Sequence, residues 1–305
     1  MRIMVATCQF PVDADIRRNQ RYVLHQMRIA RGRGAHVAHF AECALSGYAG
    51  TDFASYKEFD WSLLKECTLT VFALARQLRL WVILGSTHRL TGRHKPHNSL
   101  YVVTDRGELL DRYDKMFCAG DGTGKRGDLA HYSPGSHFSV FSIAGVRCGA
   151  LICHDYRYPE LYREYKRRGV QLMFHSYHTG HVSPGRLKAM RDDVGPRLHR
   201  INNGSTLPEI TMRAAMHAAA SNNYMWVSCS NSSAEESCWP AFFVRPDGVI
   251  TGRLRLHTAG VLISTVDTNE RFYDSTTAWR DRAMCGVFHS GVLVRDKRSA
   301  DRNLL

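Results

Sequence analysis

The 305-residue sequence has no uninterrupted apolar run of about 18 residues, so we expect no transmembrane helix. Its first ten residues lack the long apolar stretch and small-residue cleavage site of a signal peptide. It also lacks a Cys-x-x-Cys pair, and its nine cysteines are odd in number and irregularly spaced. Together these absences predict reduced thiols and a cytoplasmic protein.

The chain also shows no internal repeat, low-complexity block or linker that would divide it. We therefore expect one domain over residues 1–268. Residues 269–305 form a C-terminal extension that could pack on a partner subunit.

Acidic residues are fewer than basic ones, which gives a formal net charge of +13. Such an excess raises the hypothesis of a nucleic-acid-binding protein. The Arg and Lys residues are spread along the chain, however, and no basic module interleaved with aromatic residues is visible. Nucleic acid is therefore not the partner that we favour, and we expect no membrane partner.

Helical and strand-like patterns alternate along the sequence, which is typical of an α/β protein. Apolar residues at helical spacing predict helices over residues 13–31, 60–79, 159–168 and 207–223. Short apolar runs predict strands at 2–8, 35–40, 80–86, 170–174, 224–230 and 260–266, with hairpins turning near 105–107, 144–145 and 245–248. Residues 178–206 are polar and contain Gly and Pro, so they predict a long loop.

Cys153 stands where a predicted buried strand, "GALIC", meets a polar turn before the helix that opens at Pro159. A thiol acts as a nucleophile only as the thiolate, so it needs a base or a positive charge nearby. A sharp turn at this point also frees backbone N–H groups to bind an oxyanion. The alternative is a buried cysteine that merely ends a strand.

Two further charged residues follow predicted strands. Glu42 comes after the strand in "VAHFAECALSGY", and Lys115 comes after the strand in "LLDRYDKMF". Both are costly if buried without a partner, and the alternative is an exposed ion pair in a loop. If they converge on Cys153, the glutamate can take the thiol proton and the lysine can stabilise a charged intermediate.

Several segments resemble the nitrilase superfamily of carbon–nitrogen hydrolases, in the same order and over nearly the whole chain. "ATCQFPVDADIRRN" resembles the first strand and helix start of the family. "GAHVAHFAECALSGY", "RYDKMF" and "CGALICHDYRYPEL" resemble the segments that carry its catalytic Glu, Lys and Cys, and "RPDGVI" resembles a late hairpin turn.

The resemblance implies a four-layer αββα sandwich and a triad of Glu42, Lys115 and Cys153. It implies a thioester intermediate, release of ammonia or an amine, and hydrolysis by an activated water. It implies no metal or organic cofactor, and it implies assembly into homodimers or larger homo-oligomers.

The sequence departs from the family pattern in three places. Asp128, in "DLAHYSPG", stands where many relatives have a second Glu that can hold the catalytic Lys. His154 follows the nucleophile, where Tyr, Trp or Asn is common. The segment "HSYHTGH" replaces a Pro-containing segment, and we expect His154, Tyr177 and His178 to bind substrate and set selectivity.

We therefore expect a cysteine-dependent hydrolase of a small linear amide or N-carbamoyl compound. The alternative is a family-like scaffold that acts by binding or assembly with little or no hydrolysis. The three histidines at 175, 178 and 181 match no standard metal motif, so we expect a loop beside the pocket and no metal site.

Overall fold

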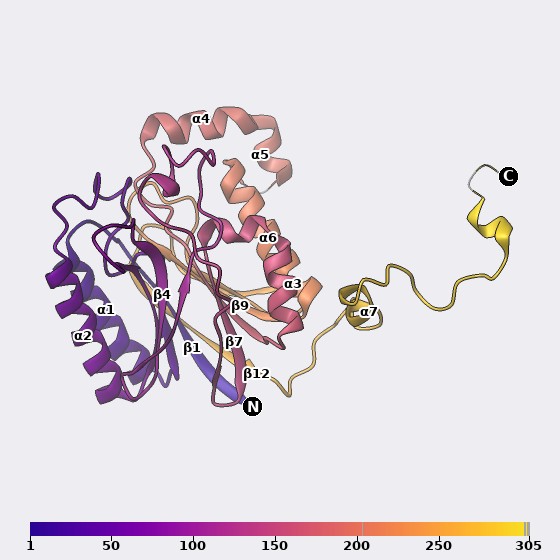
Figure 1. The fold of residues 1–305 in the computed structure, drawn as a ribbon, viewed down its shortest axis with the longest axis horizontal. Coiled ribbons are helices and arrows are strands. Elements are labelled where there is room, and N and C mark those ends of the chain that lie inside the picture. The colour runs from indigo at the N-terminus through magenta and orange to yellow at the C-terminus, as the bar shows by residue number, and fades with distance from the viewer. Residues whose placement is uncertain (203, 302, 304–305) are drawn as a thin grey trace.

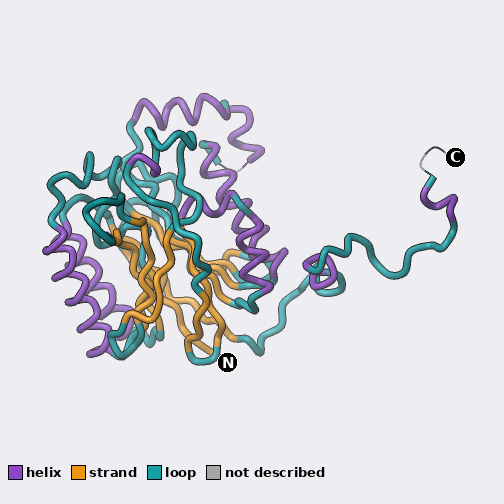
Figure 2. Tube along the Cα trace, viewed as in Figure 1, coloured by secondary structure: helices purple, strands orange, loops and turns teal. Residues whose placement is uncertain are grey.

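The computed structural model describes residues 1–202, 204–301 and 303, and Asn203, Arg302, Leu304 and Leu305 lie outside the described residues. Two β-sheets lie between layers of helices (Figures 1 and 2). The first sheet has the strand order β5-β4-β3-β2-β1-β12, and the second has β6-β7-β8-β9-β10-β11. A short parallel pairing of Gln9 and Phe10 with Asn231 and Ser232 joins β1 to β9, and hence one sheet to the other.

The strand bounds agree with most of the sequence pattern. In the first sheet the strands are β1 (Arg2–Phe10), β2 (Val37–His39), β3 (Trp81–His88), β4 (His97–Val103), β5 (Leu109–Asp114) and β12 (Gly260–Asp267). In the second they are β6 (Val140–Ile143), β7 (Val146–Ile152), β8 (Leu172–Ser176), β9 (Trp226–Ser232), β10 (Phe242–Val244) and β11 (Ile250–Arg253).

Helices cover the outer side of each sheet. The helices α1 (Ile16–Gly32) and α2 (Trp61–Leu78) pack on the first sheet through one apolar cluster. The helices α3 (Pro159–Arg167) and α6 (Leu207–Asn223) lie against the second, and a larger cluster fills the space between the two sheets. The arrangement is the predicted αββα sandwich, in which each amphipathic layer buries its apolar face against the next.

Strand direction explains where polar residues gather. Strands β1, β2 and β3 are parallel to one another, and β5 runs with them because it is antiparallel to β4, which is antiparallel to β3. Strands β7, β8 and β9 are also parallel, and β9 runs with β1. The carboxyl ends of β2, β5, β7 and β8 therefore lie at the same end of the sandwich, where sites form in α/β folds.

The long loop expected over residues 178–206 is wrong, because the segment contains α4 (Pro184–Val194) and α5 (Pro196–Asn202). Ser183 caps α4 by accepting a hydrogen bond from the Arg186 N–H, and proline occupies the first position of both helices. None of the described residues in either helix is buried. Apolar periodicity, on which the expectation relied, is therefore weak in this segment.

Beyond β12 the chain first contacts the body of the molecule, where Phe272 packs against Trp226 and the Met284 carbonyl accepts a hydrogen bond from Arg167, and it then runs outward (Figure 1). This extension holds α7 (Arg280–Met284) and a short 3₁₀ turn, and it exposes several large apolar side chains: Phe288, Val292, Leu293 and Val294. Across the described residues, no helix has both the length and the apolar character to cross a membrane.

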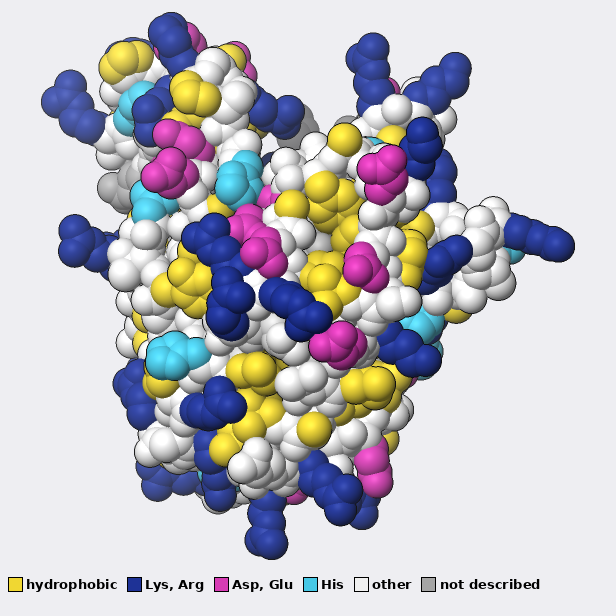
Figure 3. Space-filling model, turned by 90° about the vertical axis from the view of Figure 1, so that its left-hand side faces the viewer, with side chains coloured by type: hydrophobic (Ala, Val, Ile, Leu, Met, Phe, Trp, Pro, Cys, Tyr) yellow, Lys and Arg dark blue, Asp and Glu magenta, His cyan; other side chains and the backbone are white. Residues whose placement is uncertain are grey.

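The basic side chains are spread over the surface that Figure 3 presents. On this side of the molecule, Lys and Arg are scattered among acidic and apolar side chains rather than gathered in one stripe. A continuous basic stripe is what nucleic-acid binding requires, so this face gives that hypothesis no support.

Candidate active site

Glu42 lies in the turn that follows β2, and close backbone packing fixes this turn. A Cβ atom at Gly85 in β3 would come within 1.9 Å of the Ala41 carbonyl oxygen, so only glycine allows the approach. The backbone N–H of Glu42 donates to the Tyr177 carbonyl, 3.2 Å away. The side-chain amide of Asn98 donates to Glu42 Oε1 at 2.7 Å, so the residue is held both at its backbone and at its carboxylate.

Lys115 directly follows β5 and is fully buried, as Glu42 is. Its Nζ lies 2.8 Å from Glu42 Oε1 and 2.7 Å from Asp128 Oδ2. Burial alone would lower the pKa of Lys115, but the two carboxylates outweigh it and hold the pKa well above its usual value. The ammonium therefore stays charged although it is buried.

Asp128 opens a 3₁₀ turn (Asp128–Ala130), and both of its oxygens are occupied. Oδ2 accepts the Ala119 N–H at 2.8 Å in addition to Lys115, and Oδ1 accepts the Tyr48 hydroxyl. Burial alone would raise the pKa of Asp128, but Lys115 outweighs it and the pKa lies below its usual value. The shorter Asp side chain thus reaches the lysine directly, without a bridging water.

Cys153 comes directly after β7, which ends at Ile152, and begins a 3₁₀ turn (Cys153–Arg157). Its φ of 41° lies in the left-handed region that non-glycine residues rarely adopt, a form of strain that clusters at functional sites. Burial and then the Glu42 carboxylate raise the pKa of its thiol, while Lys115 opposes them. Cys153 is thus close enough to both side chains for their charges to act on it.

Asp155 ties the turn after Cys153 to the end of β5. Its carboxylate accepts hydrogen bonds from the N–H groups of Ile152 and Phe117, at 3.0 and 2.9 Å, and from the Tyr113 hydroxyl at 2.8 Å. Burial raises its pKa to about 6. The sequence assigns this residue no role, and its place in the polar turn directly after the strand is the only signal.

The segment 175–181 lies beside the site but is more buried than expected. The ring of Tyr177 is fully buried, stacks on His175 with centroids 4.4 Å apart, and donates its hydroxyl to Met216 Sδ. His178 is held by Asp52, with Nε2 3.0 Å from Oδ2. These contacts favour a supporting role for Tyr177 and His178 over direct contact with substrate.

His154 is only partly buried, and it packs edge-on against Tyr158. Burial and the nearby Lys115 lower the pKa of its imidazole, so His154 is neutral at physiological pH. It is therefore the expected substrate-binding residue that the structure leaves most accessible beside Cys153.

The three histidines of this segment do not share a centre. His175 contacts Tyr162 and the Cys153 carbonyl, whereas His178 and His181 contact Asp52. Within the described ranges, no group of three or more His, Cys, Asp or Glu side chains is arranged to hold a metal ion.

The family model for carbon–nitrogen hydrolases matches residues 4–271. Omega-amidase NIT2 of Homo sapiens is 31% identical to the chain over 150 residues, which cover 48% of this chain and 53% of that protein. Deaminated glutathione amidase of Yersinia enterocolitica is 30% identical over 107 residues, or 33% of this chain and 37% of that protein. The chain thus spans about half or less of the length of these curated relatives.

Solved structures extend the likeness in fold over most of the chain. A variant of the Nesterenkonia AN1 amidase, from the nitrilase superfamily, has a TM-score of 0.68 and 17% sequence identity, and the match covers 88% of this chain and 91% of that one. The family model covers most of the chain and the fold agrees with it, so the chain belongs to the carbon–nitrogen hydrolase family.

Proposed function

We propose that the protein is a cysteine-dependent amidase that cleaves a non-peptide C–N bond in a small linear amide or N-carbamoyl compound. The observation that carries the proposal is the buried Lys115 ammonium between Glu42 and Asp128, beside Cys153. Even when they are paired, three buried charged groups add little net stability, so such a cluster favours a chemical role over a purely structural one.

In the first half-reaction, Glu42 takes the proton of the Cys153 thiol and the sulfur attacks the carbonyl carbon. The carbonyl oxygen becomes an oxyanion, which the Lys115 ammonium and the backbone N–H of His154 stabilise. The C–N bond then breaks as Glu42 returns the proton to the nitrogen. Ammonia or an amine leaves, and the acyl group stays on Cys153 as a thioester.

In the second half-reaction, a water takes the place of the departed amine. Glu42 removes a proton from this water as its oxygen attacks the thioester carbon. The carbon–sulfur bond breaks, Glu42 gives its proton back to the sulfur, and a carboxylic or carbamic acid leaves. The original thiol proton leaves with the amine and a proton from the water replaces it on the sulfur, so the enzyme is restored and the reaction consumes one water and needs no cofactor.

The raised pKa of the Cys153 thiol fits this sequence of steps. A partly buried thiol beside a carboxylate stays protonated in the free protein, so the thiolate forms only when a base removes its proton. Glu42 Oε1 is occupied by Asn98 and Lys115, whereas Oε2 has no nitrogen or oxygen donor among the described residues. Oε2 is therefore the oxygen that we assign as the base.

We assign substrate selectivity to accessible residues near Cys153. His154 is the first candidate because it is partly exposed and next to Cys153 in the sequence. The amidase names of the curated relatives support an amide substrate over a nitrile. The scaffold alternative has no specific observation in its favour.

We further propose that the protein forms homo-oligomers in which the extension 269–305 packs on a second copy.

A panel of linear amides, N-carbamoyl compounds and nitriles tests the proposal. Native protein should release ammonia or an amine from at least one amide or carbamoyl compound, and Cys153→Ala should not. Two outcomes would reject the assignment. One is release of ammonia or an amine by Cys153→Ala, and the other is no release by native protein from any amide or carbamoyl compound in the panel.

A further inference from the structure

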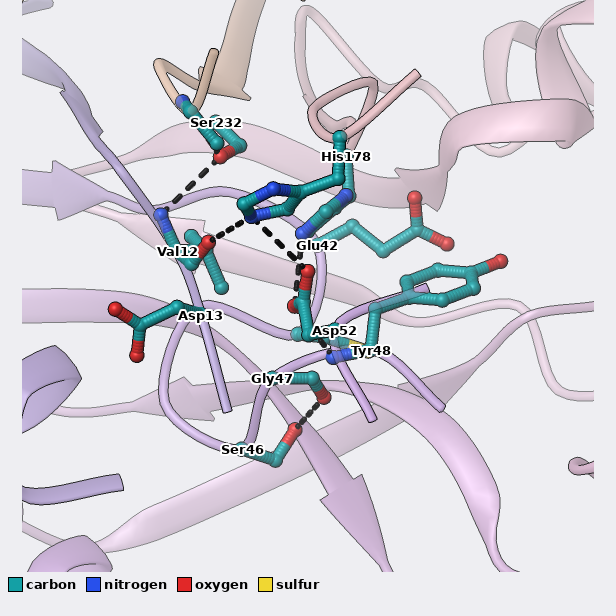
Figure 4. A network of polar contacts seen from close by, with 12 residues as sticks. Val12, Asp13, Glu42, Ser46, Gly47, Tyr48, Asp52, His178 and Ser232 are labelled. Atoms are coloured by element: carbon teal, nitrogen blue, oxygen red, sulfur yellow. Dashed lines mark hydrogen bonds and ion pairs between the residues drawn. The ribbon is translucent and has the colours of Figure 1, made fainter. Parts of the chain in front are cut away.

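A buried ion pair lies next to the site and is not explained by the proposed chemistry. Asp52 is fully buried in its side chain, and its Oδ2 lies 3.0 Å from His178 Nε2. The same oxygen accepts the backbone N–H of Tyr48 at 2.8 Å (Figure 4). His181 Nε2 lies 3.4 Å from the other oxygen, Oδ1. The loop after β2 and the segment after β8 are therefore tied together through one carboxylate.

The electrostatics favour a charged His178. Burial alone would lower the pKa of its imidazole, but the Asp52 carboxylate outweighs burial and the pKa lies above its usual value. Besides Asp52, the Glu42 carboxylate acts on this imidazole, and the rings of Tyr48 and His181 pack beside it with centroids 5.2 and 6.4 Å away. The imidazolium neutralises Asp52 in surroundings where an unpaired carboxylate is costly.

Tyr48 connects this pair to the catalytic cluster. Its hydroxyl donates to Asp128 and accepts from Lys115 Nζ at 3.4 Å, and its ring centroid lies 5.7 Å from that ammonium. Figure 4 shows the side chains of Glu42 and Tyr48 reaching toward the same side of their loop, with Asp52 at the base of Tyr48. Tyr48 is thus fixed at its backbone by Asp52, at its ring by His178 and at its hydroxyl by Asp128.

We propose that Asp52 and the protonated His178 form a positioning pair that holds Tyr48 against Lys115 and Asp128, so that turnover requires His178 to carry a proton. The inference rests on the proposed amidase function. It gives a role to residues 175–181, where the sequence departs from the family pattern. Neither residue touches the reacting atoms, and both act through Tyr48.

The expected pH dependence follows from the sign of the pKa shift. Because the His178 pKa is raised, the pair is intact below that pKa and is lost as the pH rises through it. Asp52 then keeps an uncompensated charge, and the loop that carries Tyr48 loosens. A loosened Tyr48 misdirects the Lys115 ammonium, so kcat should fall on the alkaline side while KM changes little.

The test measures kcat and KM against pH on the best substrate of the panel, for native protein, His178→Gln and Asp52→Asn. Gln can still donate a hydrogen bond to Asp52 but cannot carry the charge. We expect His178→Gln to lower kcat by roughly ten- to a hundredfold and to abolish the alkaline fall that His178 causes. Asp52→Asn should move that fall to lower pH, because the counter-charge is gone.

The control is His137→Gln, which removes an imidazole at the same 3.0 Å from a carboxylate, Asp111, but with 61% of the side chain exposed. It should keep the native profile. If His178→Gln does not fold, proton titration of labelled histidines in native protein and in Asp52→Asn replaces it, and an unchanged His178 pKa overturns the inference.

The outcomes separate the two proposals. No Cys153-dependent hydrolysis by native protein would reject the amidase function itself. Hydrolysis by native protein, together with native kcat and an unchanged alkaline fall in His178→Gln, would reject only the positioning pair.

Discussion

The hydroxyl of Tyr113, at the end of β5, donates a hydrogen bond of 2.8 Å to Asp155, two residues after Cys153. Tyr113 stands two residues before Lys115, so this bond links the strand end that carries the lysine to the turn that carries the thiol. Strand β5 pairs in the first sheet, and β7, which precedes Cys153, pairs in the second. The spacing between sulfur and ammonium therefore depends on a contact across the sandwich.

Tyr113→Phe should weaken both stability and turnover. The substitution leaves a buried carboxylate with one donor fewer, which should cost about 1–3 kcal/mol in the free energy of unfolding, measured by urea denaturation. We expect kcat to fall as well, because the turn can shift relative to Lys115. Tyr101→Phe is the control, since it also removes a buried hydroxyl, bonded to His88 at 2.9 Å. If the two variants lose equal kcat, the link has no special role.

Lys115→Met should lower kcat by roughly a hundredfold or more, because it removes the positive charge that we propose stabilises the oxyanion. It should also lower the free energy of unfolding by about 3–5 kcal/mol, since Glu42 and Asp128 are left buried without a counter-ion. Adding Asp128→Asn should restore part of the stability but none of the activity. A double variant that recovers kcat would contradict the role of the lysine charge.

The positions of Glu42, Lys115 and Cys153 could be predicted because each follows an apolar strand, and parallel strands place their carboxyl ends at one edge. The local sequence predicts the strand before each of these residues. The family resemblance indicates that the three segments occur in the order known for the family. Their mutual distances could not be predicted, because these depend on contacts between sheets. The Tyr113–Asp155 bond joins residues 42 positions apart, and neither residue type signals its partner.

Stability should fall with acid because histidines are buried in the neutral form. Burial lowers the pKa of His175 to about 3, so between pH 6.5 and 3 the unfolded chain binds a proton that the folded protein does not. The free energy of unfolding should therefore fall toward acid by up to about 1.4 kcal/mol per pH unit from this residue. Urea denaturation from pH 7 to 4 should show a shallower slope in His175→Gln. Equal slopes would mean that His175 does not contribute.

Deleting residues 286–305 should reduce the mass of the assembly. The deletion removes several exposed apolar side chains, including Phe288 and Val292. Exposed apolar side chains that cluster in this way are typical of a surface that contacts another protein. Light scattering on native and truncated protein measures the mass directly. An unchanged mass would show that the end of the extension does not contribute to assembly.

The parts of the fold that sequence patterns missed have physical reasons. Helices α4 and α5 were missed because their described residues are not buried, so no apolar stripe marks them. The pairing of Asp52 with His178 was missed because an ion pair between two loops leaves no periodic trace. Alternating and helical apolar patterns predict only segments that pack on the core. Neither the exposed helices nor the ion pair between loops belongs to such a segment.

Trapping the acyl-enzyme tests the central claim most directly. Native protein is mixed with the best amide substrate, quenched in acid within one turnover, digested and analysed by mass spectrometry. We predict an added acyl mass on the peptide that contains Cys153, and its accumulation in Glu42→Gln if that variant still acylates more rapidly than it deacylates. An acyl mass on another cysteine, or turnover by Cys153→Ala at the native rate, would contradict the account.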